Sequence, residues 1–507
     1  METRGSWSSR FTFILAAIGS AVGLGCAWRF PGLAAKHGGG SFLLVFIIAT
    51  FVFGIPLLMM EIAIGRKMKK GVTSSLRGIN KKFEFVGWAA TSNAFVIGCY
   101  YAIVYAWVIL MVLVSFKFIG MTGDTAAAGN LFFNTIQTTG TVENYGIAPS
   151  MIIPFVLAWA SIFYCLRNGT ESVGKIVKYT VFLPVIFLGI IAVKGLTMPG
   201  AMDGIRALFV PDFNALRNPQ IWVDAIGQVF YSLSVMMAIM FAYGSYLKDD
   251  SNIAVDGMII GISNILISVL AGVAMFTTMG GVGMLGEMTP SGISTAFIVY
   301  PQAIVSLTSS GIVNAIFGAL FYLCLVALAV DSAFSIIEGV SAAIADSFHL
   351  DAKKTTKVVI LIMLVCSVFF ATRAGLAWLD IVDNWANSYN LIIVGILQCI
   401  ALGWFFKPQK VLLEINRNTS KFKMPAWWFV TSVKFIAPLI LSALFAWNIY
   451  DLFVKNNGNY GGYPQWALIV GGWLITLLVM VSGLVARRII EAKKKKGFVE
   501  EEVSWED

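Results

Sequence analysis

The sequence predicts an all-α, polytopic membrane protein with two five-helix repeats followed by two further spans. Of its 507 residues, 58% are hydrophobic and only 12% are charged, whereas soluble domains carry about 25% charged residues. Apolar segments recur along the whole chain, each close to the roughly 20 residues that a membrane-spanning helix requires. Matched polar interruptions in the first and sixth of these segments indicate an internal repeat.

Twelve segments satisfy the length criterion. They are 11–36, 41–65, 85–116, 149–166, 176–195, 222–246, 253–280, 312–343, 357–373, 379–406, 427–452 and 464–488. Basic residues gather in the connections 66–82, 350–357 and 407–423 and after the last span. Because Lys and Arg are retained on the cytoplasmic side, this bias and the even number of spans predict that both termini are cytoplasmic.

The first span is interrupted in its middle, where residues 19–31 read GSAVGLGCAWRFP. Glycine disfavours a continuous helix by roughly 1 kcal/mol relative to alanine. Close helix packing through the Gly19 and Gly23 spacing is one explanation. Arg29, a charged residue at the end of an apolar segment, favours a functional site instead. We therefore predict a broken helix whose freed backbone groups bind a ligand.

Spans six and eight also carry polar residues. Span six has Ser232 and Ser234 followed by methionines, at the position that span one holds in the first half of the chain. Span eight carries Asp331 and Ser332 among apolar residues, and a carboxylate in that environment requires a cation or a partner. The predicted organisation is a transporter core over 1–406, with repeats at about 1–195 and 222–406, two additional spans over 407–488, and a charged cytoplasmic tail over 489–507.

Several function classes are disfavoured by composition. The six cysteines have no CxxC spacing, and the two histidines, His37 and His349, are far apart in sequence, so no metal-ligand or nucleophile constellation points to an enzyme. The net charge of +9 resides largely in short loops beside apolar spans, so it gives no reason to expect nucleic acid as a partner. An ion channel is the remaining rival to a carrier, and saturable sodium-driven uptake would separate the two.

Five motifs together resemble those of the neurotransmitter:sodium symporter family, in its bacterial amino-acid transporter branch. They are GSAVGLGCAWRFP, GGGSF, GQVFYSLS, VDSAFSIIEG and LDIVDNWANS, in this order along the chain. The resemblance extends over spans one to ten. It implies an inverted-repeat bundle in which spans one and six unwind at the middle of the membrane. It also implies a sodium-coupled symporter and not an enzyme. The protein would lie in the plasma membrane, here a bacterial inner membrane, in contact with lipid.

The resemblance implies two sodium sites. The first would use the carbonyls of Gly19, Val22 and Leu328 and the side chains of Asp331 and Ser332. The second would use the Ala21 carbonyl and the side chains of Cys26, Ser232 and Asn264. The family pattern has asparagine where this chain has Cys26, and a soft thiol is a poor ligand for a hard cation. We therefore expect the second site to be weak or absent.

A chloride site is also implied by the resemblance, from Phe46, Gln228, Ser232, Asn264 and Ser268. Chloride-independent relatives have a glutamate at the position of Ser268, and its absence favours a chloride requirement. Phe46 replaces the tyrosine of chloride-dependent members, which argues the other way. The balance slightly favours chloride dependence.

For the cargo, Gly23 is the most informative position, because relatives that carry amines without a carboxylate usually have aspartate there. Glycine leaves space and backbone amides for a carboxylate at the positive end of a half-helix. The implied cargo site comprises Ser20, Ala21, Gly23, Leu24, Gly25, Ile97, Tyr101, Tyr231, Ser232, Ser234, Met237, Ser332 and Ile336. Its apolar side-chain pocket favours a neutral, apolar amino acid. A non-α amino acid such as taurine, β-alanine or GABA is the alternative.

Two gates are implied as well. Arg29 and Asp383 would close the outer side by a salt bridge, with Tyr101 and Tyr231 as a lid. Arg4, Trp7, Tyr246 and Asp346 would close the cytoplasmic side, although solvated surface charge is the simpler explanation for Arg4 and Asp346 when the resemblance is set aside. Met236 replaces a common glycine, and it either narrows the pocket or stiffens the unwound turn. The sequence is compatible with both a monomer and a homodimer.

Overall fold

The computed structural model describes residues 5–288, 291–418, 422–495 and 504–506. Within these residues all regular structure is helical, and the only β-type pairings are two isolated bridges, Gly39 with Pro211 and Ile147 with Thr372. The all-α prediction is therefore confirmed.

Ten helices of the described chain are long and apolar enough to cross a membrane: Gly40–Met68, Lys81–Met121, Pro149–Leu166, Thr170–Leu196, Ile253–Gly281, Gly311–Phe348, Ala352–Ala371, Gly375–Phe405, Ala426–Lys455 and Gln465–Lys494. Span one is a bent pair, Arg10–Ala21 with Gly25–Lys36. The predicted span six consists of two shorter helices, α12 (Pro219–Ser232) and α13 (Ile239–Ser245), neither long enough to cross alone. The twelve predicted segments thus all contain helix, and the sixth is interrupted rather than continuous.

Further helices lie between the spans or form parts of them. Those used below are α1 (Arg10–Ala21), α2 (Phe30–Lys36), α4 (Ile55–Met68), α5 (Val72–Ile79), α6 (Glu84–Val114), α7 (Thr125–Ile136), α9 (Thr170–Thr180), α10 (Phe182–Leu196), α11 (Ala201–Phe209), α14 (Ile253–Gly281), α17 (Gly311–Phe348), α18 (Ala352–Ser367), α19 (Gly375–Trp385), α20 (Leu391–Ile400), α21 (Pro408–Asn416) and α25 (Ile475–Lys494).

Short polar side chains set the start of several helices. The Ser9 hydroxyl accepts a hydrogen bond from the Thr12 amide at the start of α1, and Asn252 does the same for α14. Asp351 caps α18 in the same way. Such caps satisfy amides that have no partner inside the helix, so polar residues that border the apolar segments fix where these helices begin.

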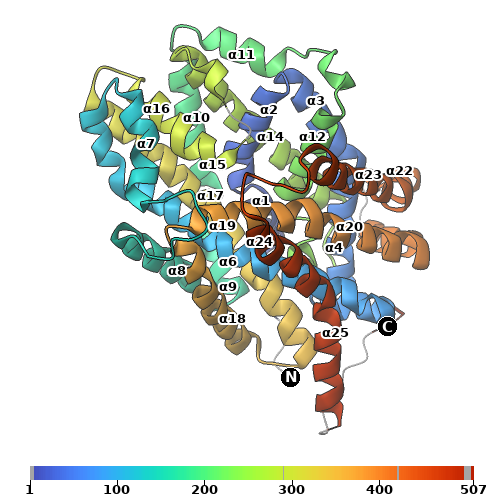
Figure 1. Cartoon of the computed structure of the whole chain (residues 1–507). Coiled ribbons are helices and arrows are strands. Elements are labelled where there is room, and N and C mark those ends of the chain that lie inside the picture. Colours follow the sequence, from blue (N-terminus) through green and yellow to red (C-terminus); the bar gives the residue numbers. More distant parts are fainter. Residues whose placement is uncertain (1–4, 289–290, 419–421, 496–503, 507) are drawn as a thin grey trace.

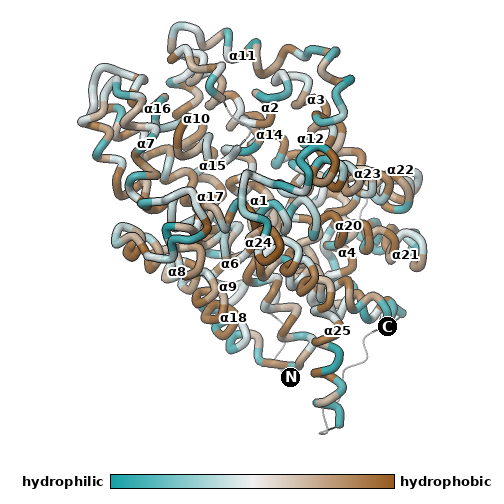
Figure 2. Tube along the Cα trace, viewed as in Figure 1, coloured by the Kyte–Doolittle hydropathy of each residue, from teal (hydrophilic) through white to brown (hydrophobic). Residues whose placement is uncertain are grey.

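The helices pack as one bundle around α1, whose neighbours include α9, α14 and α17 (Figure 1). The pairs α6 with α17, α10 with α14 and α4 with α13 form extensive contacts. Large apolar side chains such as Ile153 and Leu439 are exposed on the outside, at 64% and 72%. Figure 2 shows hydrophobic residues on the flanks of the bundle and hydrophilic ones toward its two ends. This distribution is that of a multi-pass membrane protein.

The two ends of the bundle differ. Both described chain ends and the end of α25 lie at one of them, which we call the terminal face, while α7 and α11 lie toward the opposite face (Figure 1). Helices α5 and α21 belong to the terminal face, because Gly78 and Lys410 contact the C-terminal residues Trp505 and Glu506. At the terminal face, Arg66 Nη2 lies 2.8 Å from Glu414 Oε1, and both side chains are buried. This pair joins α4 to α21. Because a buried pair is costly to break, it fixes α21 against the bundle.

Candidate functional site

Span one is broken as the glycine-rich sequence predicts. Helix α1 ends at Ala21, and a π-helical segment, Gly25–Arg29, leads into α2. The two halves of the span meet at a bend of 50°. The first amides of a helix have no intrahelical partner, so this break places polar backbone in the interior of the bundle.

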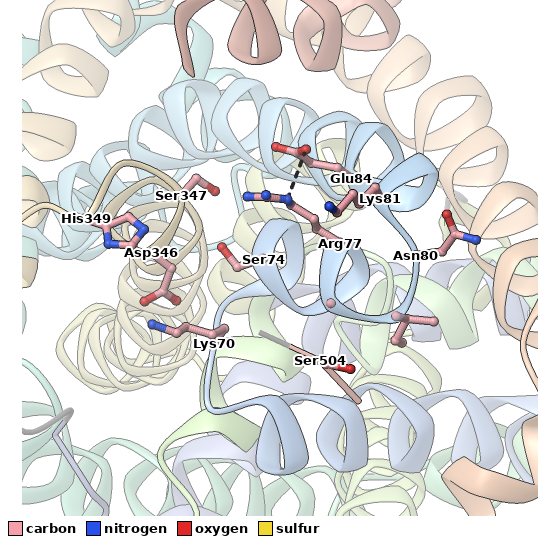
Figure 3. Close-up of a pocket in the computed structure, with 12 residues that line it drawn as sticks. Lys70, Ser74, Arg77, Asn80, Lys81, Glu84, Asp346, Ser347, His349 and Ser504 are labelled. Carbon is pink, nitrogen blue, oxygen red and sulfur yellow. Dashed lines mark ion pairs between the residues drawn. The ribbon is translucent and has the colours of Figure 1, made fainter. Parts of the chain in front are cut away.

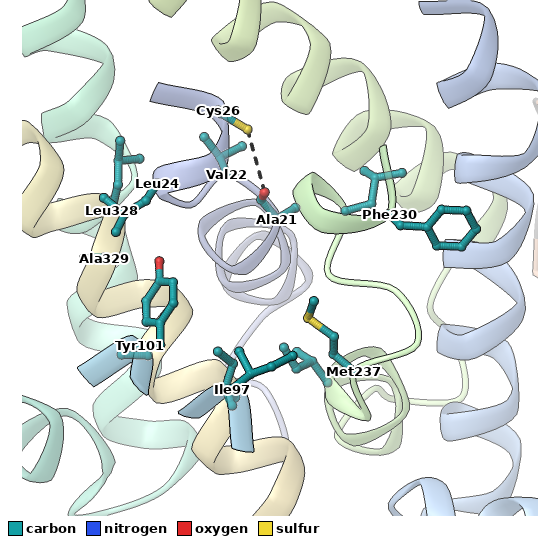
Figure 4. Close-up of a cluster of buried hydrophobic side chains, with 14 of the residues drawn as sticks. Ala21, Val22, Leu24, Cys26, Ile97, Tyr101, Phe230, Met237, Leu328 and Ala329 are labelled. Atoms are coloured by element: carbon teal, nitrogen blue, oxygen red, sulfur yellow. Dashed lines mark hydrogen bonds between the residues drawn. The ribbon is translucent and has the colours of Figure 1, made fainter. Parts of the chain in front are cut away.

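One cavity lies beside this break, and every side chain predicted for the cargo site lines it. Its walls comprise Ser20, Ala21, Gly23, Leu24, Gly25, Ile97, Tyr101, Tyr231, Ser232, Ser234, Met237, Ser332 and Ile336, with Ile239 as an addition. Figure 4 shows Ile97 and Tyr101 of α6 and Met237 of the segment between α12 and α13 beside the broken end of α1. Residues from four distant parts of the sequence thus form one small, largely apolar chamber.

Gly23 permits the close approach of α17 to this chamber. A Cβ atom at Gly23 would lie 2.3 Å from Ser332 Oγ and 3.5 Å from the Tyr101 hydroxyl. The Tyr101 hydroxyl is buried and has no hydrogen-bond partner, although buried hydroxyls usually have one. The chamber therefore offers a hydroxyl that is available to a polar group of a small ligand.

A second, much smaller hollow borders α1 around Asp331. It is lined by Gly19, Val22, Leu328 and Asp331, as predicted for the first cation site, and also by Thr180 of α9. Ser332, the fifth predicted ligand, lines the cargo chamber instead. Thr180 was not predicted from the sequence. Its signal is a hydroxyl residue that directly precedes the apolar run 181–185 of span five.

Asp331 is the principal charge of this second cavity. Its side chain is only 1% exposed, and its Oδ1 atom has no hydrogen-bond partner. A Cβ atom at Gly19 would lie 2.5 Å from Asp331 Oδ2, so only glycine allows α1 to approach this carboxylate so closely. A buried carboxylate oxygen without a partner is disfavoured, and a hard cation held by oxygen atoms would satisfy it.

The residues predicted for the second cation site also lie together. The Cys26 thiol lies 3.2 Å from Asn264 Oδ1 and 3.9 Å from the Ala21 carbonyl oxygen, and the latter contact is drawn in Figure 4. The Asn264 amide in turn donates to Ser232 Oγ at 3.0 Å. The soft Cys26 thiol therefore lies beside Asn264 and Ala21, where a hard cation would require an oxygen ligand.

The residues predicted to hold chloride surround the same cluster. The Gln228 amide donates to the Gly25 carbonyl at 3.0 Å, whereas Gln228 Oε1 and the Ser268 hydroxyl are buried without partners. Phe46 belongs to an aromatic cluster, with its ring centroid 5.1 Å from that of Phe30. The Ser268 hydroxyl is thus a buried polar group of this set without a close hydrogen-bond partner.

Span six is broken between α12 and α13 by residues that are not glycine. Ser234, Met236 and Ala238 have φ angles of +52°, +65° and +65°. The left-handed region disfavours residues with a Cβ atom by about 1–2 kcal/mol each. The Ser234 hydroxyl donates to the Ser20 carbonyl at 2.8 Å, which ties this turn to the end of α1.

Glu61 supports the turn from span two. Its Oε1 atom accepts the Met236 amide at 2.9 Å and the Gln398 side-chain amide at 2.8 Å. Glu61 is fully buried. Sequence reasoning missed it, although a glutamate within an apolar span is itself a signal of function. The Met236 side chain does not line the cargo chamber and its Cγ lies near Gly395 of α20, so this residue acts on the turn and not on the pocket.

Arg29 and Asp383, the pair predicted to close the outer gate, have other partners in this structure. No ion pair joins Arg29 to Asp383 within the part of the chain that the structure describes. Arg29 lies over the Tyr231 ring, 5.3 Å from its centroid, and Asp383 accepts a hydrogen bond from Asn387 at 2.8 Å. Arg29 and Tyr231 both line a further hollow between α12 and α20. The expected salt bridge is therefore absent from this conformation.

The terminal face is closed around Trp7, which is 3% exposed. The Trp7 indole donates to the Tyr243 carbonyl at 3.0 Å, and its backbone amide donates to the Tyr246 carbonyl at 3.1 Å. The Tyr246 hydroxyl pairs with Glu338, and Asp346 accepts the Gly71 amide. Glu338 is thus a further member of this cluster that was not predicted, while Arg4 lies outside the described residues.

Comparison with known proteins gives this geometry its context. The family model described as "Sodium:neurotransmitter symporter family" matches residues 4–126 and 125–492. An uncharacterized sodium-dependent transporter of Methanocaldococcus jannaschii is 34% identical, over 96% of this chain and 98% of the relative. The sodium- and chloride-dependent GABA transporter 2 of Rattus norvegicus is 27% identical, over 97% and 88%.

A further relative is the sodium-dependent neutral amino acid transporter B(0)AT3 of Mus musculus, which is 26% identical over 98% of this chain and 95% of the relative. The match extends over nearly the whole chain in each case, and these relatives are transporters and not enzymes. The chain therefore belongs to the sodium:neurotransmitter symporter family.

Proposed function

We propose that this protein imports a neutral amino acid with an apolar side chain, together with sodium, by alternating access. In this proposal the terminal face is cytoplasmic, both termini lie in the cytoplasm, and the protein resides in the plasma membrane, in a bacterium the inner membrane. The core would consist of inverted repeats over about 1–195 and 222–406. The alternative cargo is a non-α amino acid such as taurine, β-alanine or GABA.

The observation that carries the proposal is that one helix break borders both cavities. Gly19 and Val22 line the cavity around Asp331, and Gly23 and Leu24 line the cargo chamber. A sodium ion bound to Asp331 and to the carbonyls at the end of α1 would order the break. The ordered break would in turn present the amides and the Tyr101 hydroxyl to the cargo. Such shared ordering couples two ligands thermodynamically.

The cargo class follows from the chemistry of the chamber. Its hydroxyl and backbone amides suit a carboxylate, and Ile97, Met237 and Ile336 suit an apolar side chain. A side chain at position 23 would crowd the chamber, because a Cβ atom at Gly23 would lie 2.3 Å from Ser332 Oγ. The relatives include transporters named for GABA and for neutral amino acids, which supports both the proposed cargo and the alternative.

The second sodium site and chloride form the finer part of the proposal. Cys26 supplies a thiol where an oxygen ligand would be needed, so we propose that one sodium ion drives transport and that the second site is weak. Chloride dependence is proposed on the Ser268 hydroxyl, which is buried, unpartnered and not replaced by a carboxylate. Replacing chloride by gluconate in the assay below tests that dependence.

The proposed gates follow from alternating access. Arg29 and Asp383 would pair when the outer side closes over Tyr101 and Tyr231, after which the Trp7 cluster with Tyr246, Asp346 and Arg4 would open. A charge pair that forms in only one conformation biases that conformation, and it therefore affects the rate of turnover more than the affinity for cargo.

Uptake into proteoliposomes tests the proposal. Labelled amino acids should accumulate under an inward sodium gradient and not under a potassium gradient. Unlabelled neutral α-amino acids should compete, whereas their decarboxylated amines should not. Gly23→Asp should abolish binding by crowding and like-charge repulsion, and Gly23→Ala serves as the control for crowding alone. Competition by amines equal to that by their parent amino acids would contradict the assignment of the cargo, and stronger competition by GABA, taurine or β-alanine would favour the alternative.

A further inference from the structure

Span eleven (Ala426–Lys455) carries a lysine near the outer surface of the bundle. Lys434 is half-buried in the π-helical segment Ser432–Ile436, beside Phe435, which is 50% exposed. The span has 30 residues, so it is about 45 Å long, whereas the hydrocarbon core of a membrane is about 30 Å thick. Centred on that core, the span would hold the Lys434 backbone about 10 Å from the midplane, just inside the hydrocarbon boundary. A cation at this depth requires a partner.

Two aromatic rings hold the Lys434 side chain. Its Nζ atom lies 5.2 Å from the ring centroid of Trp404 and 5.4 Å from that of Phe435. The two rings meet edge-on with their centroids 5.6 Å apart, and the Trp404 indole donates to the Lys434 carbonyl at 2.8 Å. A cation over aromatic rings gains a modest attraction, whereas a charge within hydrocarbon is costly. The rings therefore position the ammonium without balancing its charge.

Backbone packing fixes this cation where spans ten and eleven meet. A Cβ atom at Gly403 would lie 3.0 Å from Lys434 Cα, so the two spans approach each other closely at this level. Span eleven is also tied to span two, because the Trp428 indole donates to the Phe51 carbonyl at 2.8 Å. Trp404 is 58% exposed on the outside of this contact. The ammonium thus has a fixed base and an open side.

Other cations of the chain lie beside carboxylates. Lys455, at the other end of the same span, has its Nζ atom 3.3 Å from Asp451 Oδ1. At the terminal face, Arg77 Nε lies 3.9 Å from Glu84 Oε2, and this pair is drawn in the pocket of Figure 3. No ion pair joins Lys434 to an acidic residue among the residues that the structure describes. The described chain therefore does not supply a counter-charge for Lys434.

We propose that the junction of spans ten and eleven, formed by Trp404, Lys434 and Phe435, binds an anionic phospholipid. The lipid phosphate would pair with the Lys434 ammonium, which the long lysine side chain can carry toward the headgroups. The acyl chains would cover the exposed aromatic rings. A soluble anion could supply the charge but could not cover the apolar surface. This site is independent of the proposed transport function.

The surroundings of the junction match both parts of such a lipid. Lys407 follows the end of span ten and Lys423 precedes span eleven, and both are exposed. A negatively charged headgroup would therefore lie between cations, which attract anionic lipids to a membrane protein. Leu439 is 72% exposed and lies one helical turn beyond Phe435, where it would contact an acyl chain.

Fluorescence quenching by brominated lipids tests the proposal. In a Cys366→Ala background, which removes the one exposed cysteine among six, a fluorophore is attached to Leu439→Cys in α23 (Ala437–Tyr450). The protein is reconstituted into phosphatidylcholine vesicles with increasing brominated phosphatidylglycerol, or with brominated phosphatidylcholine as the reference. Phosphatidylglycerol should be preferred at this label by about fivefold, the effect of one lysine near a membrane surface.

A label on the opposite flank supplies the spatial control. Ile153 is 64% exposed on α8 (Ile152–Leu166), and α8 and α23 lie on opposite flanks of the bundle (Figure 1). A fluorophore on Ile153→Cys should be quenched equally by the two brominated lipids. An equal preference for phosphatidylglycerol at both labels would show a general attraction to the protein and would contradict a site at the junction.

Three variants assign the preference to the charge at position 434. Lys434→Met keeps an unbranched side chain without the charge and should abolish the preference, whereas Lys434→Arg should retain it. Lys455→Met is the matched control, because it removes a lysine of the same span that lies 4.5 Å from the Trp447 ring centroid and has its own carboxylate. This control should leave the preference unchanged.

Equal quenching by the two lipids at Leu439→Cys, or a preference that persists in Lys434→Met, would overturn the proposal. The first of these comparisons uses the native lysine, so it stands even where a variant fails to fold. Displacement of brominated phosphatidylglycerol by inorganic phosphate would indicate a soluble anion, and stronger displacement by oleate would indicate a carboxylate amphiphile. Either displacement would contradict the assignment of a phospholipid.

Discussion

The two interrupted spans of the bundle break by different means. Span one breaks at Val22–Leu24 amid glycines, and its residues Gly19 and Gly23 approach Asp331 and Ser332 so closely that a Cβ atom would collide with either. Span six breaks at Leu233–Ala238 without a glycine, and three of its residues have positive φ angles. The helix of span one is thus interrupted where its own sequence is rich in glycine, whereas the interruption of span six is maintained by contacts with neighbouring residues.

The difference shows which contacts each break requires. In span one the absence of side chains allows α17 to bring the Asp331 carboxylate close to Gly19 and the Ser332 hydroxyl close to Gly23. In span six, Glu61 accepts the Met236 amide and the Ser234 hydroxyl binds the Ser20 carbonyl. These contacts offset the backbone strain, which is stored at functional sites when the surrounding structure maintains it.

The largest effect is expected from filling the space in span one. Gly19→Ala would place a Cβ atom 2.5 Å from Asp331 Oδ2 and 3.0 Å from Val181 Cγ2. Such overpacking costs about 1–3 kcal/mol, so the sodium affinity of uptake should fall by roughly 10- to 100-fold. Gly189→Ala, where a Cβ atom would contact nothing within 4 Å, should transport normally. Equal sodium affinities in the two variants would show that the close approach is unimportant.

A smaller effect is expected from removing the support of span six. Glu61→Ala would leave the buried Met236 amide and the Gln398 side chain without their acceptor. Leaving buried polar groups unpaired costs about 1–3 kcal/mol each. Thermal unfolding in detergent should therefore occur at a lower temperature, and uptake should fall because the turn loses its fixed form. A variant as stable as the unmodified protein would contradict the role given to Glu61.

The smallest effect should come from relieving strain in the same turn. Ala238→Gly removes the steric conflict at a φ of +65°, and it should stabilise the protein by about 1 kcal/mol or less, because glycine also gains entropy in the unfolded state. The same substitution at Ala242, in the helical part of span six, should instead destabilise by roughly 1 kcal/mol. Denaturant midpoints of the two variants that shift in the same direction would refute the assignment of strain.

The sequence indicated the first break more fully than the second. The glycine-rich segment and Arg29 indicated the break in span one. The polar residues of span six indicated an interruption there, but not the left-handed backbone of its turn. Glu61 carried a signal in the sequence, as a glutamate within an apolar span, but its partners Met236 and Gln398 are known only from the folded bundle. Thr180 escaped notice because it meets Asp331 only where α9 and α17 come together. The salt bridge predicted between Arg29 and Asp383 is absent among the described residues, and its formation in another conformation stays a prediction.

The role of Met236 also depended on the fold. Its place in the sequence was compatible with narrowing the pocket or with stiffening the turn, and only the direction of its side chain toward Gly395 separates them. The chamber itself was predicted through five motifs that resemble those of a known family. Apolar periodicity alone could not have brought Ile97, Tyr231 and Ser332 to one place, because they lie on different spans.

The central claim is that a sodium ion at Asp331 orders the break that binds the cargo, and sodium-dependent binding to an Asp331→Asn variant tests it most directly. Asparagine preserves the shape of the side chain and removes its charge. The variant should elute as a folded protein in detergent, yet its binding of amino acid should no longer increase with sodium, and it should not concentrate amino acid in proteoliposomes. Ser332→Ala, which removes a neutral hydroxyl, should reduce sodium affinity less. Sodium-driven binding and uptake by Asp331→Asn at the level of the unmodified protein would contradict the claim.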